Sequence, residues 1–201
     1  MIKRQSEAGM PMPYGQFRMI AYADRKREKM PHFALVSEHM NPIKPLLVRI
    51  HSECVTGDLF GSKRCDCGEQ LERSLELAAQ EGGVVVYLRQ EGRGIGIINK
   101  LKAYQLQDTG LNTIDANTHL GLEVDSRQYD IAVEILKDLG IHTIDLLTNN
   151  PLKIEAIATS EIHIRKRVPL HIPPKKENYS YLKTKKDKMG HLLAVNGKVP
   201  H

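Results

Sequence analysis

The 201-residue sequence contains no tryptophan, only three cysteines and no run of about eighteen apolar residues. The last absence argues against a transmembrane helix, and the charged N-terminus is followed by no apolar segment typical of a signal peptide, so we expect a cytoplasmic protein without membrane contacts. Three cysteines cannot pair completely within one chain, which argues against a disulfide framework. Aromatic residues, at 5%, are too few for the stacking surfaces that bind single-stranded nucleic acids.

A net charge of +5 would otherwise suggest a nucleic-acid partner. The positive surplus is confined to the C-terminal end, because the part of the chain after residue 172 contains seven lysines and only two acidic residues, Glu177 and Asp187. The preceding part of the chain is balanced, so we expect no nucleic-acid binding. We predict one domain over residues 1–172 and a basic, partly mobile C-terminal segment over residues 173–201, which either closes over a ligand or simply ends the protein.

The hydrophobic pattern predicts an α/β fold in a single domain, with a mixed β-sheet covered by helices on both faces. The early strands follow one another without helices and should form a meander. Later elements alternate between helix and strand, and glycines follow the three helical patterns. Strands are expected at residues 17–22, 33–37, 45–51, 83–88, 143–147 and 162–168, and helices at residues 68–80, 97–108 and 126–139.

The cysteines Cys54, Cys65 and Cys67 lie within fourteen positions of one another. If residues 65–67 are extended, Cys65 and Cys67 point the same way, and Cys54 can reach them from another strand. Three thiolates suit zinc and leave a fourth position for water, as in catalytic sites, whereas a fourth ligand such as His51 or Asp66 would make the site structural. The alternative is three small buried apolar side chains.

Two strand-to-helix turns are candidate phosphate sites. In RQEGRGIGIINK, Gly92, Gly94 and Gly96 precede a helix, where free amides can bind an anion or merely permit a tight turn. In LLTNNPLKIEAI, Thr148 and Lys153 flank a similar junction. The local sequence there is also explained by helix capping alone, with an asparagine cap followed by proline.

Asp125 and Arg127, in EVDSRQYD, have two interpretations. Asp125 or Ser126 could cap the helix that follows, with Arg127 in its first turn. Alternatively, Asp125 is a base and Arg127 binds phosphate or stabilises charge. Tyr104 shares an apolar helical stripe with Ile97 and Leu101, which by itself predicts a core tyrosine.

Four segments together resemble the GTP cyclohydrolase II family, which opens the purine ring of GTP at the start of riboflavin biosynthesis. They are RIHSECVTGDLFGSKRCDCGEQL, YLRQEGRGIGIINKLKAYQLQD, LGLEVDSRQYD and LLTNNPLKIEAI, in this order and spacing. The resemblance extends from about residue 5 to residue 193, whereas the final AVNGKVPH matches nothing in the family. Residues 1–172 would then form the catalytic domain.

The resemblance implies one Zn²⁺ per chain on Cys54, Cys65 and Cys67, Mg²⁺ bound with the triphosphate, and a homodimer. Asp125 would be the general base. Arg127 would be a nucleophile toward the α-phosphorus or a stabiliser of phosphoryl charge, and Tyr104 would assist ring opening at C8 and formate loss. Formate, pyrophosphate and 2,5-diamino-6-(5-phosphoribosylamino)pyrimidin-4-one would be released. Residues implied in GTP binding are Arg49, Ile50, His51, Ser52, Glu53, Gln70, Glu91, Gly92, Arg93, Thr113, Thr148 and Lys153.

Other readings stay open at this point. A zinc-stabilised RNA- or DNA-binding module would use the basic end and a closed four-ligand site. A related enzyme could stop at the formamidopyrimidine, against which Tyr104 argues, or prefer another nucleotide. A larger bifunctional relative places this domain behind a dihydroxybutanone phosphate synthase, and because the resemblance begins near residue 1 we expect that activity to be absent.

Overall fold

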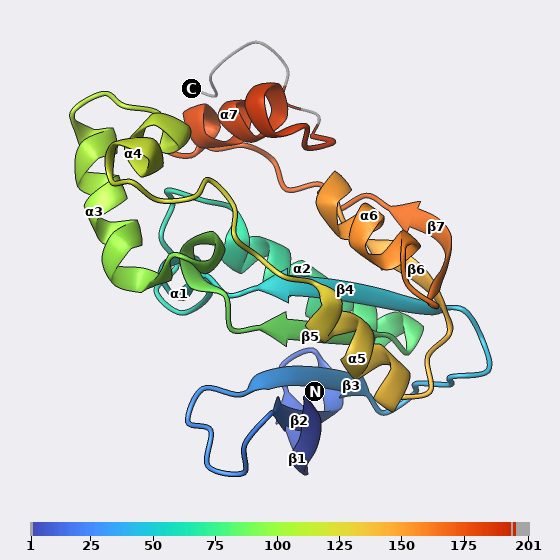
Figure 1. Cartoon of the computed structure of the whole chain (residues 1–201). Helices are drawn as coiled ribbons and strands as arrows, with labels where there is room; N and C mark the ends of the chain where they lie inside the picture. Colours follow the sequence, from blue (N-terminus) through green and yellow to red (C-terminus); the bar gives the residue numbers. More distant parts are fainter. Residues whose placement is uncertain (1, 194, 196–201) are drawn as a thin grey trace. The chain divides into compact units, whose positions relative to one another are not determined.

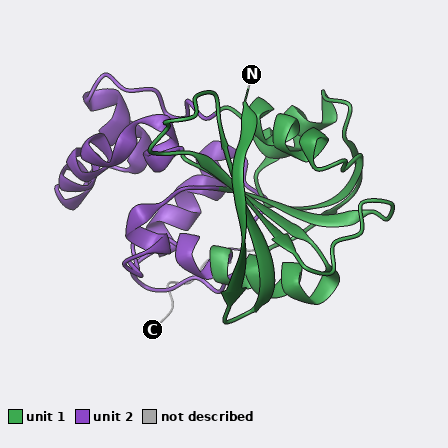
Figure 2. Cartoon of the chain, turned by 90° about the horizontal axis from the view of Figure 1, so that it is seen from below, with its two compact units in different colours: residues 1–51, 71–89, 128–170 green, residues 52–70, 90–127, 171–201 purple. Residues whose placement is uncertain are grey.

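The computed structural model describes residues 2–193 and 195. Two compact units divide the chain (Figure 2). Unit 1 comprises residues 1–51, 71–89 and 128–170, and unit 2 comprises residues 52–70, 90–127 and 171–201. Each unit is assembled from three separate segments of the chain, so no single cut in the sequence divides them.

A seven-stranded mixed sheet forms the centre of unit 1, with the strand order β1-β2-β3-β5-β4-β6-β7 (Figure 1). The pairs β1–β2, β2–β3 and β3–β5 are antiparallel, and β4–β6 and β6–β7 are parallel. The predicted meander of the early strands is only partly correct, because β5 lies between β3 and β4. The strands are β1 (Lys3–Met12), β2 (Gly15–Ala23), β3 (His32–Ser37), β4 (Leu46–Ser52), β5 (Val84–Leu88), β6 (Thr143–Leu147) and β7 (His163–Val168). The sequence pattern missed β1, an edge strand whose side chains are mostly exposed.

Helices cover both faces of this sheet, as the sequence predicts. Successive strand residues point to opposite faces, so Val84 and Val86 join the apolar cluster that includes α5 (Asp130–Asp138), and Val85 joins the cluster of α2 (Cys67–Glu81). The helix α6 (Pro151–Ala158) packs on the α5 side through Ile157. The α/β class and the mixed sheet are therefore confirmed.

Unit 2 is built mainly from short helices: α1 (Val55–Asp58), the 3₁₀ turn η1 (Glu91–Gly94), α3 (Gly96–Asp108), α4 (Thr113–His119) and α7 (Tyr179–Met189). The predicted helix at residues 97–108 is confirmed as α3, but its apolar stripe is wrong. Leu101 is 50% exposed and Ile98 is 68% exposed, whereas Lys100 and Ala103 are buried. The sequence pattern did not predict α1, α4 or α7.

The basic C-terminal segment, predicted over residues 173–201, contains α7 among its described residues. Tyr179 and Leu182 of α7 are buried in a small apolar cluster with Val195. The unmatched AVNGKVPH end lies largely outside the described residues, which omit residues 194 and 196–201. Over the part of the chain that the structure describes, no helix is long and apolar enough to cross a membrane.

Candidate active site

The three cysteines come together in unit 2. Their sulfur atoms all lie within 4.8 Å of one another, and Cys54 Sγ and Cys65 Sγ are 3.6 Å apart. Cys54 directly precedes α1, and Cys67 is the first residue of α2, one position before the predicted start of this helix. The expected extended segment is wrong, because residues 65–66 form a bend before the helix. The sulfurs therefore converge through a bend in the backbone and not through an extended segment.

The cluster fits a zinc ion. Sulfur ligands about 2.3 Å from one tetrahedral zinc lie about 3.8 Å apart, close to the observed separation and far beyond the ~2.05 Å of a disulfide. Hydrogen bonds with Cys65 and Cys67 lower the pKa of the Cys54 thiol, while the contact with Cys54 raises the pKa of Cys65 to about 11 and that of Cys67 well above its usual value. One ionised thiol therefore disfavours ionisation of the other two. A divalent cation bound by the sulfurs removes this penalty, because it favours the thiolate form of all three.

Lys100 provides a buried positive charge beside the sulfurs. Its ammonium donates to Cys54 Sγ at 3.1 Å and to Glu91 Oε1 at 2.8 Å. The other Glu91 oxygen accepts from the Val55 amide at 2.6 Å, so the turn η1 is tied to α1. Burial disfavours a charged lysine, but the neighbouring negative charges of Cys54 and Glu91 raise the pKa of Lys100 and keep it protonated.

Tyr104 lies one helical turn after Lys100, and the Lys100 ammonium is 5.8 Å from the centre of its ring. The guanidinium of Arg64, which directly precedes Cys65, stacks on the ring at 4.9 Å and is fixed by Asp108 at 2.7 Å. Burial raises the pKa of Tyr104, so its hydroxyl keeps its proton at neutral pH. The core interpretation of Tyr104 is therefore wrong: its neighbours are cations next to the cysteine cluster.

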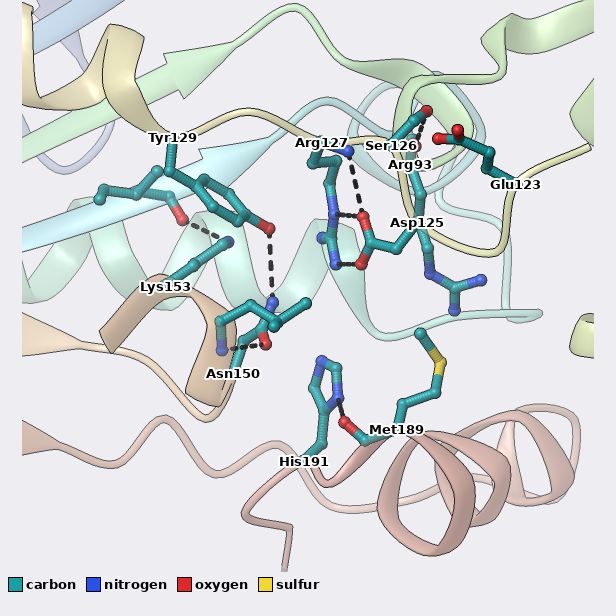
Figure 3. A network of polar contacts seen from close by, with 12 residues as sticks. Arg93, Glu123, Asp125, Ser126, Arg127, Tyr129, Asn150, Lys153, Met189 and His191 are labelled. Carbon is teal, nitrogen blue, oxygen red and sulfur yellow. Dashed lines mark hydrogen bonds and ion pairs between the residues drawn. The ribbon is translucent and has the colours of Figure 1, made fainter. Parts of the chain in front are cut away.

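Asp125 and Arg127 form a bidentate ion pair in the loop before α5 (Figure 3). Arg127 donates through Nε at 2.7 Å and through its own backbone amide at 3.2 Å to one Asp125 oxygen, and through Nη2 to the other. Burial alone raises the pKa of Asp125, but Arg127 outweighs burial and holds the pKa below its usual value. The capping interpretation is wrong, because α5 begins at Asp130 after Tyr129.

The glycine-rich turn fixes this loop. Both the amide and the hydroxyl of Ser126 donate to the Arg93 carbonyl at 3.1 Å. A Cβ on Gly94 would lie 2.4 Å from Ser126 Oγ, so the close approach requires glycine. Arg93 has φ 64°, a strained conformation for a residue other than glycine, and Gly92 has φ 63°. The geometric role of these glycines is therefore confirmed, and phosphate binding stays a prediction.

Unit 1 holds a second group of predicted residues around a buried lysine. Lys153 Nζ donates to the Ile50 carbonyl at 2.7 Å and lies 5.6 Å from the centre of the Tyr129 ring. Arg49 donates to the Leu147 carbonyl at 3.2 Å. The capping interpretation of this turn is confirmed, since the Asn150 side chain accepts from Leu152 at 3.0 Å (Figure 3).

The other predicted nucleotide contacts have local structural partners. His51 stacks on Tyr87 in unit 1 with ring centres 5.5 Å apart, and Thr148 Oγ1 accepts from the Asn150 amide. Ser52 is the last residue of β4, Glu53 is buried directly after it, and Thr113 begins α4. Their role in GTP binding stays a prediction.

Asp66, considered above as a fourth metal ligand, is engaged elsewhere. Its carboxylate accepts from Gln70 Nε2 at 2.5 Å and lies 3.4 Å from the Lys185 ammonium. Across the described residues, the sulfur cluster includes no histidine, aspartate or glutamate as a further member. The arrangement favours three protein ligands.

His191, which the sequence analysis did not consider, lies at the edge of this region. Its Nδ1 is 3.3 Å from the Met189 carbonyl, and its ring points toward the Arg127 guanidinium (Figure 3). Burial, together with the charges of Lys185, Arg127 and Arg93, lowers the pKa of His191 to about 3. The folded protein therefore holds a neutral imidazole over the whole physiological range.

This neutral imidazole predicts a loss of stability in acid. An unfolded chain protonates histidine near pH 6.5, whereas folded His191 stays neutral down to about pH 3. The unfolded state binds more protons in between, so stability falls as the pH is lowered, by on the order of 1 kcal/mol per pH unit from this group. Urea unfolding at pH 7.5 and 5.5 should show a smaller loss for His191→Gln than for wild type. An equal loss in both proteins would contradict the assignment.

The chain matches a described family of proteins. A family model described as GTP cyclohydrolase II matches residues 3–169. The riboflavin biosynthesis protein RibBA of Bacillus cereus is 50% identical over 194 residues, covering 96% of this chain and 49% of the relative. RibBA of Chlorobium phaeovibrioides is 48% identical over 197 residues, covering 98% and 48%. The chain thus spans about half the length of these curated relatives.

Among solved structures, RibBX of A. baumannii, described as a two-domain 3,4-dihydroxy-2-butanone 4-phosphate synthase, aligns with a TM-score of 0.47 and 19% sequence identity. The alignment covers 83% of this chain and 40% of that one. A likeness at this level supports no conclusion about the site.

Proposed function

The chain belongs to the GTP cyclohydrolase II family, and on that premise we propose that it hydrolyses GTP in a zinc-dependent reaction. Ring opening at C8 would release formate and pyrophosphate and give 2,5-diamino-6-(5-phosphoribosylamino)pyrimidin-4-one, in the first step of riboflavin biosynthesis. The observation that carries the proposal is the buried cluster of Cys54, Cys65 and Cys67 with Lys100 against it. The two other clusters of unit 2, around Tyr104 and Asp125, are consistent with it.

Cys54, Cys65 and Cys67 would hold the metal. Zinc bound there would act as a Lewis acid, making a water molecule acidic enough to serve as a nucleophile near neutral pH. The three thiolates carry more negative charge than zinc neutralises, and the Lys100 ammonium at 3.1 Å from Cys54 Sγ offsets this excess. Glu91 fixes the ammonium, which explains why this acidic residue is buried beside the sulfurs.

Asp125 would accept a proton, and Arg127 would interact with the substrate phosphates. In the structure Arg127 occupies both oxygens of Asp125, which lowers the basicity of that carboxylate. A phosphate group is a strong competitor for a guanidinium. We therefore propose that phosphate draws Arg127 away and that this movement frees Asp125 to act as a base. Whether Arg127 attacks the α-phosphorus or only stabilises its charge, the ion pair has to open first.

Tyr104 would act as a hydrogen-bond donor during ring opening. Its raised pKa keeps the hydroxyl protonated, and its ring is held between the cations of Arg64 and Lys100. A protonated phenol beside the cysteine cluster can donate to a nitrogen that gains charge as the C8–N bond breaks. This role assigns Tyr104 to the step that separates formate release from an early stop at the formamidopyrimidine.

The remaining expectations rest on the family. We propose that GTP brings Mg²⁺ with its triphosphate, because nucleotide phosphates usually bind this ion. In unit 1, Arg49, Ile50, His51, Thr148 and Lys153 stay predicted GTP contacts. In unit 2, the same holds for Ser52, Glu53, Gln70, Glu91, Gly92, Arg93 and Thr113. The homodimer and the cytoplasmic location likewise stay predictions.

The test is to incubate the purified protein, with its metal content measured, with GTP and Mg²⁺ and to follow formate and pyrophosphate together. Equal release of both products is expected. ATP in place of GTP serves as the substrate control. A protein that carries one zinc per chain and releases no formate from GTP would overturn the proposal and make the metal structural.

A further inference from the structure

The C-terminal segment contacts the loop that carries two of the cysteines. We call residues 63–69 the cysteine loop. Lys175 pairs with Glu69 at 2.8 Å, Glu177 with Lys63 at 4.0 Å, and Lys185 with Asp66 at 3.4 Å. All of these residues belong to unit 2. The contacting lysines of the segment lie beyond the region matched by the family model, which ends at residue 169.

These ion pairs differ in burial. Glu69 and Lys175 keep about 39% and 41% of their side-chain surface exposed, so their pair contributes little. Lys185 and Asp66 keep only 12% and 3%. A charge left unpaired at such a position is costly, so each of these two residues requires the other.

Asp66 stands directly between Cys65 and Cys67. Its carboxylate is held from two sides, by Gln70 at the start of α2 and by Lys185 of α7. Because its backbone joins the two cysteines, the position of Asp66 determines the direction in which both sulfurs point. A side chain that fixes Asp66 therefore fixes the bend on which the sulfur cluster depends.

The position of Lys185 is itself well determined. Its ammonium lies 4.9 Å from the centre of the Tyr181 ring on the same helix, and the Tyr181 hydroxyl accepts from Arg93 Nη2 at 3.5 Å. Tyr179 and Leu182 of α7 are buried in a small apolar cluster, and Tyr181 packs against that cluster. The helix ends in a left-handed glycine, Gly190, with φ 65°. The lysine is thus presented by an anchored helix and does not belong to a solvated tail.

We propose that Lys185 is a positioning residue for the metal centre, which it preorganises through its ion pair with Asp66. The inference rests on the proposed metal role of the three cysteines. Without Lys185, the buried Asp66 carboxylate loses its ion-pair partner, and the backbone at residues 65–66 is held less firmly in its bend. Metal binding then has to order the loop first, which lowers affinity. Partners of this kind outside the ligand set typically change metal affinity by 10- to 100-fold.

Zinc affinity, measured by competition with a chromophoric chelator, tests the proposal directly. Lys185→Met is expected to weaken zinc binding by about 10- to 100-fold. Lys185→Arg should restore most of it, because the guanidinium can reach the same carboxylate. Lys188→Met is the matched control, an exposed lysine on the same helix, and should bind zinc like wild type. Equal affinity in Lys185→Met and wild type would overturn the proposal.

A double-mutant cycle with Asp66→Asn covers the case in which Lys185→Met folds poorly. If the two residues act as a pair, the double variant loses about as much affinity as either single variant. Independent, additive losses would contradict the pairing. The absorption bands of the cobalt-substituted protein provide a second readout of the sulfur geometry, expected to change in Lys185→Met and to persist in Lys188→Met. None of these measurements uses GTP, so wild type that binds zinc but releases no formate would overturn the proposed function alone.

Discussion

Replacing Cys54 by serine should abolish formate release from GTP and reduce zinc to well below one ion per chain. A serine hydroxyl stays protonated at neutral pH and is a poor zinc ligand, whereas the Cys54 thiol has a lowered pKa and is the sulfur nearest to Lys100. With two ligands left, the metal is lost. The rate of formate release should fall by at least about a thousandfold, because water has a pKa near 15.7 without a metal and about 7 with one.

The control for this experiment is Ser62→Ala, a substitution in the same region that leaves all three thiols in place. It should retain zinc and turnover. If the cysteines were only small buried apolar side chains, Cys54→Ser would change stability without changing metal content. A variant that keeps full zinc occupancy and loses only stability would therefore eliminate the three-thiolate site.

The sequence predicted the parts of the site that are close together along the chain. Cys54, Cys65 and Cys67 are separated by few residues, so their convergence needed little knowledge of tertiary structure. The strands other than β1, and the helices α2 and α3, follow from hydrophobic periodicity, and Asn150 with Pro151 marked the start of α6. Even where the local geometry was wrong, as in the bend at residues 65–66, the spacing alone kept the sulfurs within reach.

The errors arise where local sequence permits two structures. An aspartate before a short polar stretch is typical both of a helix cap and of a turn in which its side chain bonds to the residues that follow. Asp125 adopts the second arrangement, with Arg127. Similarly, the stripe of Ile97, Leu101 and Tyr104 has helical spacing, but spacing does not tell which face of α3 is covered. The buried face instead contains Lys100.

The contacts that the sequence could not reveal join distant segments. Lys185 meets Asp66 across 119 positions, and Lys100 meets Cys54 across 46. A lysine-rich end normally predicts a solvated segment, and nothing in its spacing distinguishes Lys185 from the exposed lysines on the same helix. For Lys100 a signal did exist, since it lies four residues before Tyr104 and therefore on the same face of the helix.

Gly57→Ala should disrupt the metal centre although it replaces none of the three cysteines. A Cβ at residue 57 would lie 2.8 Å from Cys65 Sγ, 3.1 Å from Cys67 Cβ and 3.3 Å from Cys54 Sγ. These contacts are shorter than normal packing allows, so at least one cysteine has to move. We expect zinc affinity to fall at least about tenfold, as for other substitutions that disturb ligand orientation, with formate release falling in parallel.

The direction of the change in zinc affinity distinguishes a steric clash from an effect of helix propensity. Gly57 lies in α1, where alanine is favoured over glycine by about 1 kcal/mol, so the substitution by itself should favour the helix. Gly9→Ala is the control, since a Cβ there meets nothing within 4 Å. If Gly57→Ala binds zinc as tightly as wild type, the sulfurs can move to accommodate the added Cβ. The close packing at residue 57 is then not required for zinc binding. If zinc is lost while the helix is retained, the absence of a side chain at residue 57 is what lets the three thiols come close enough to share one ion.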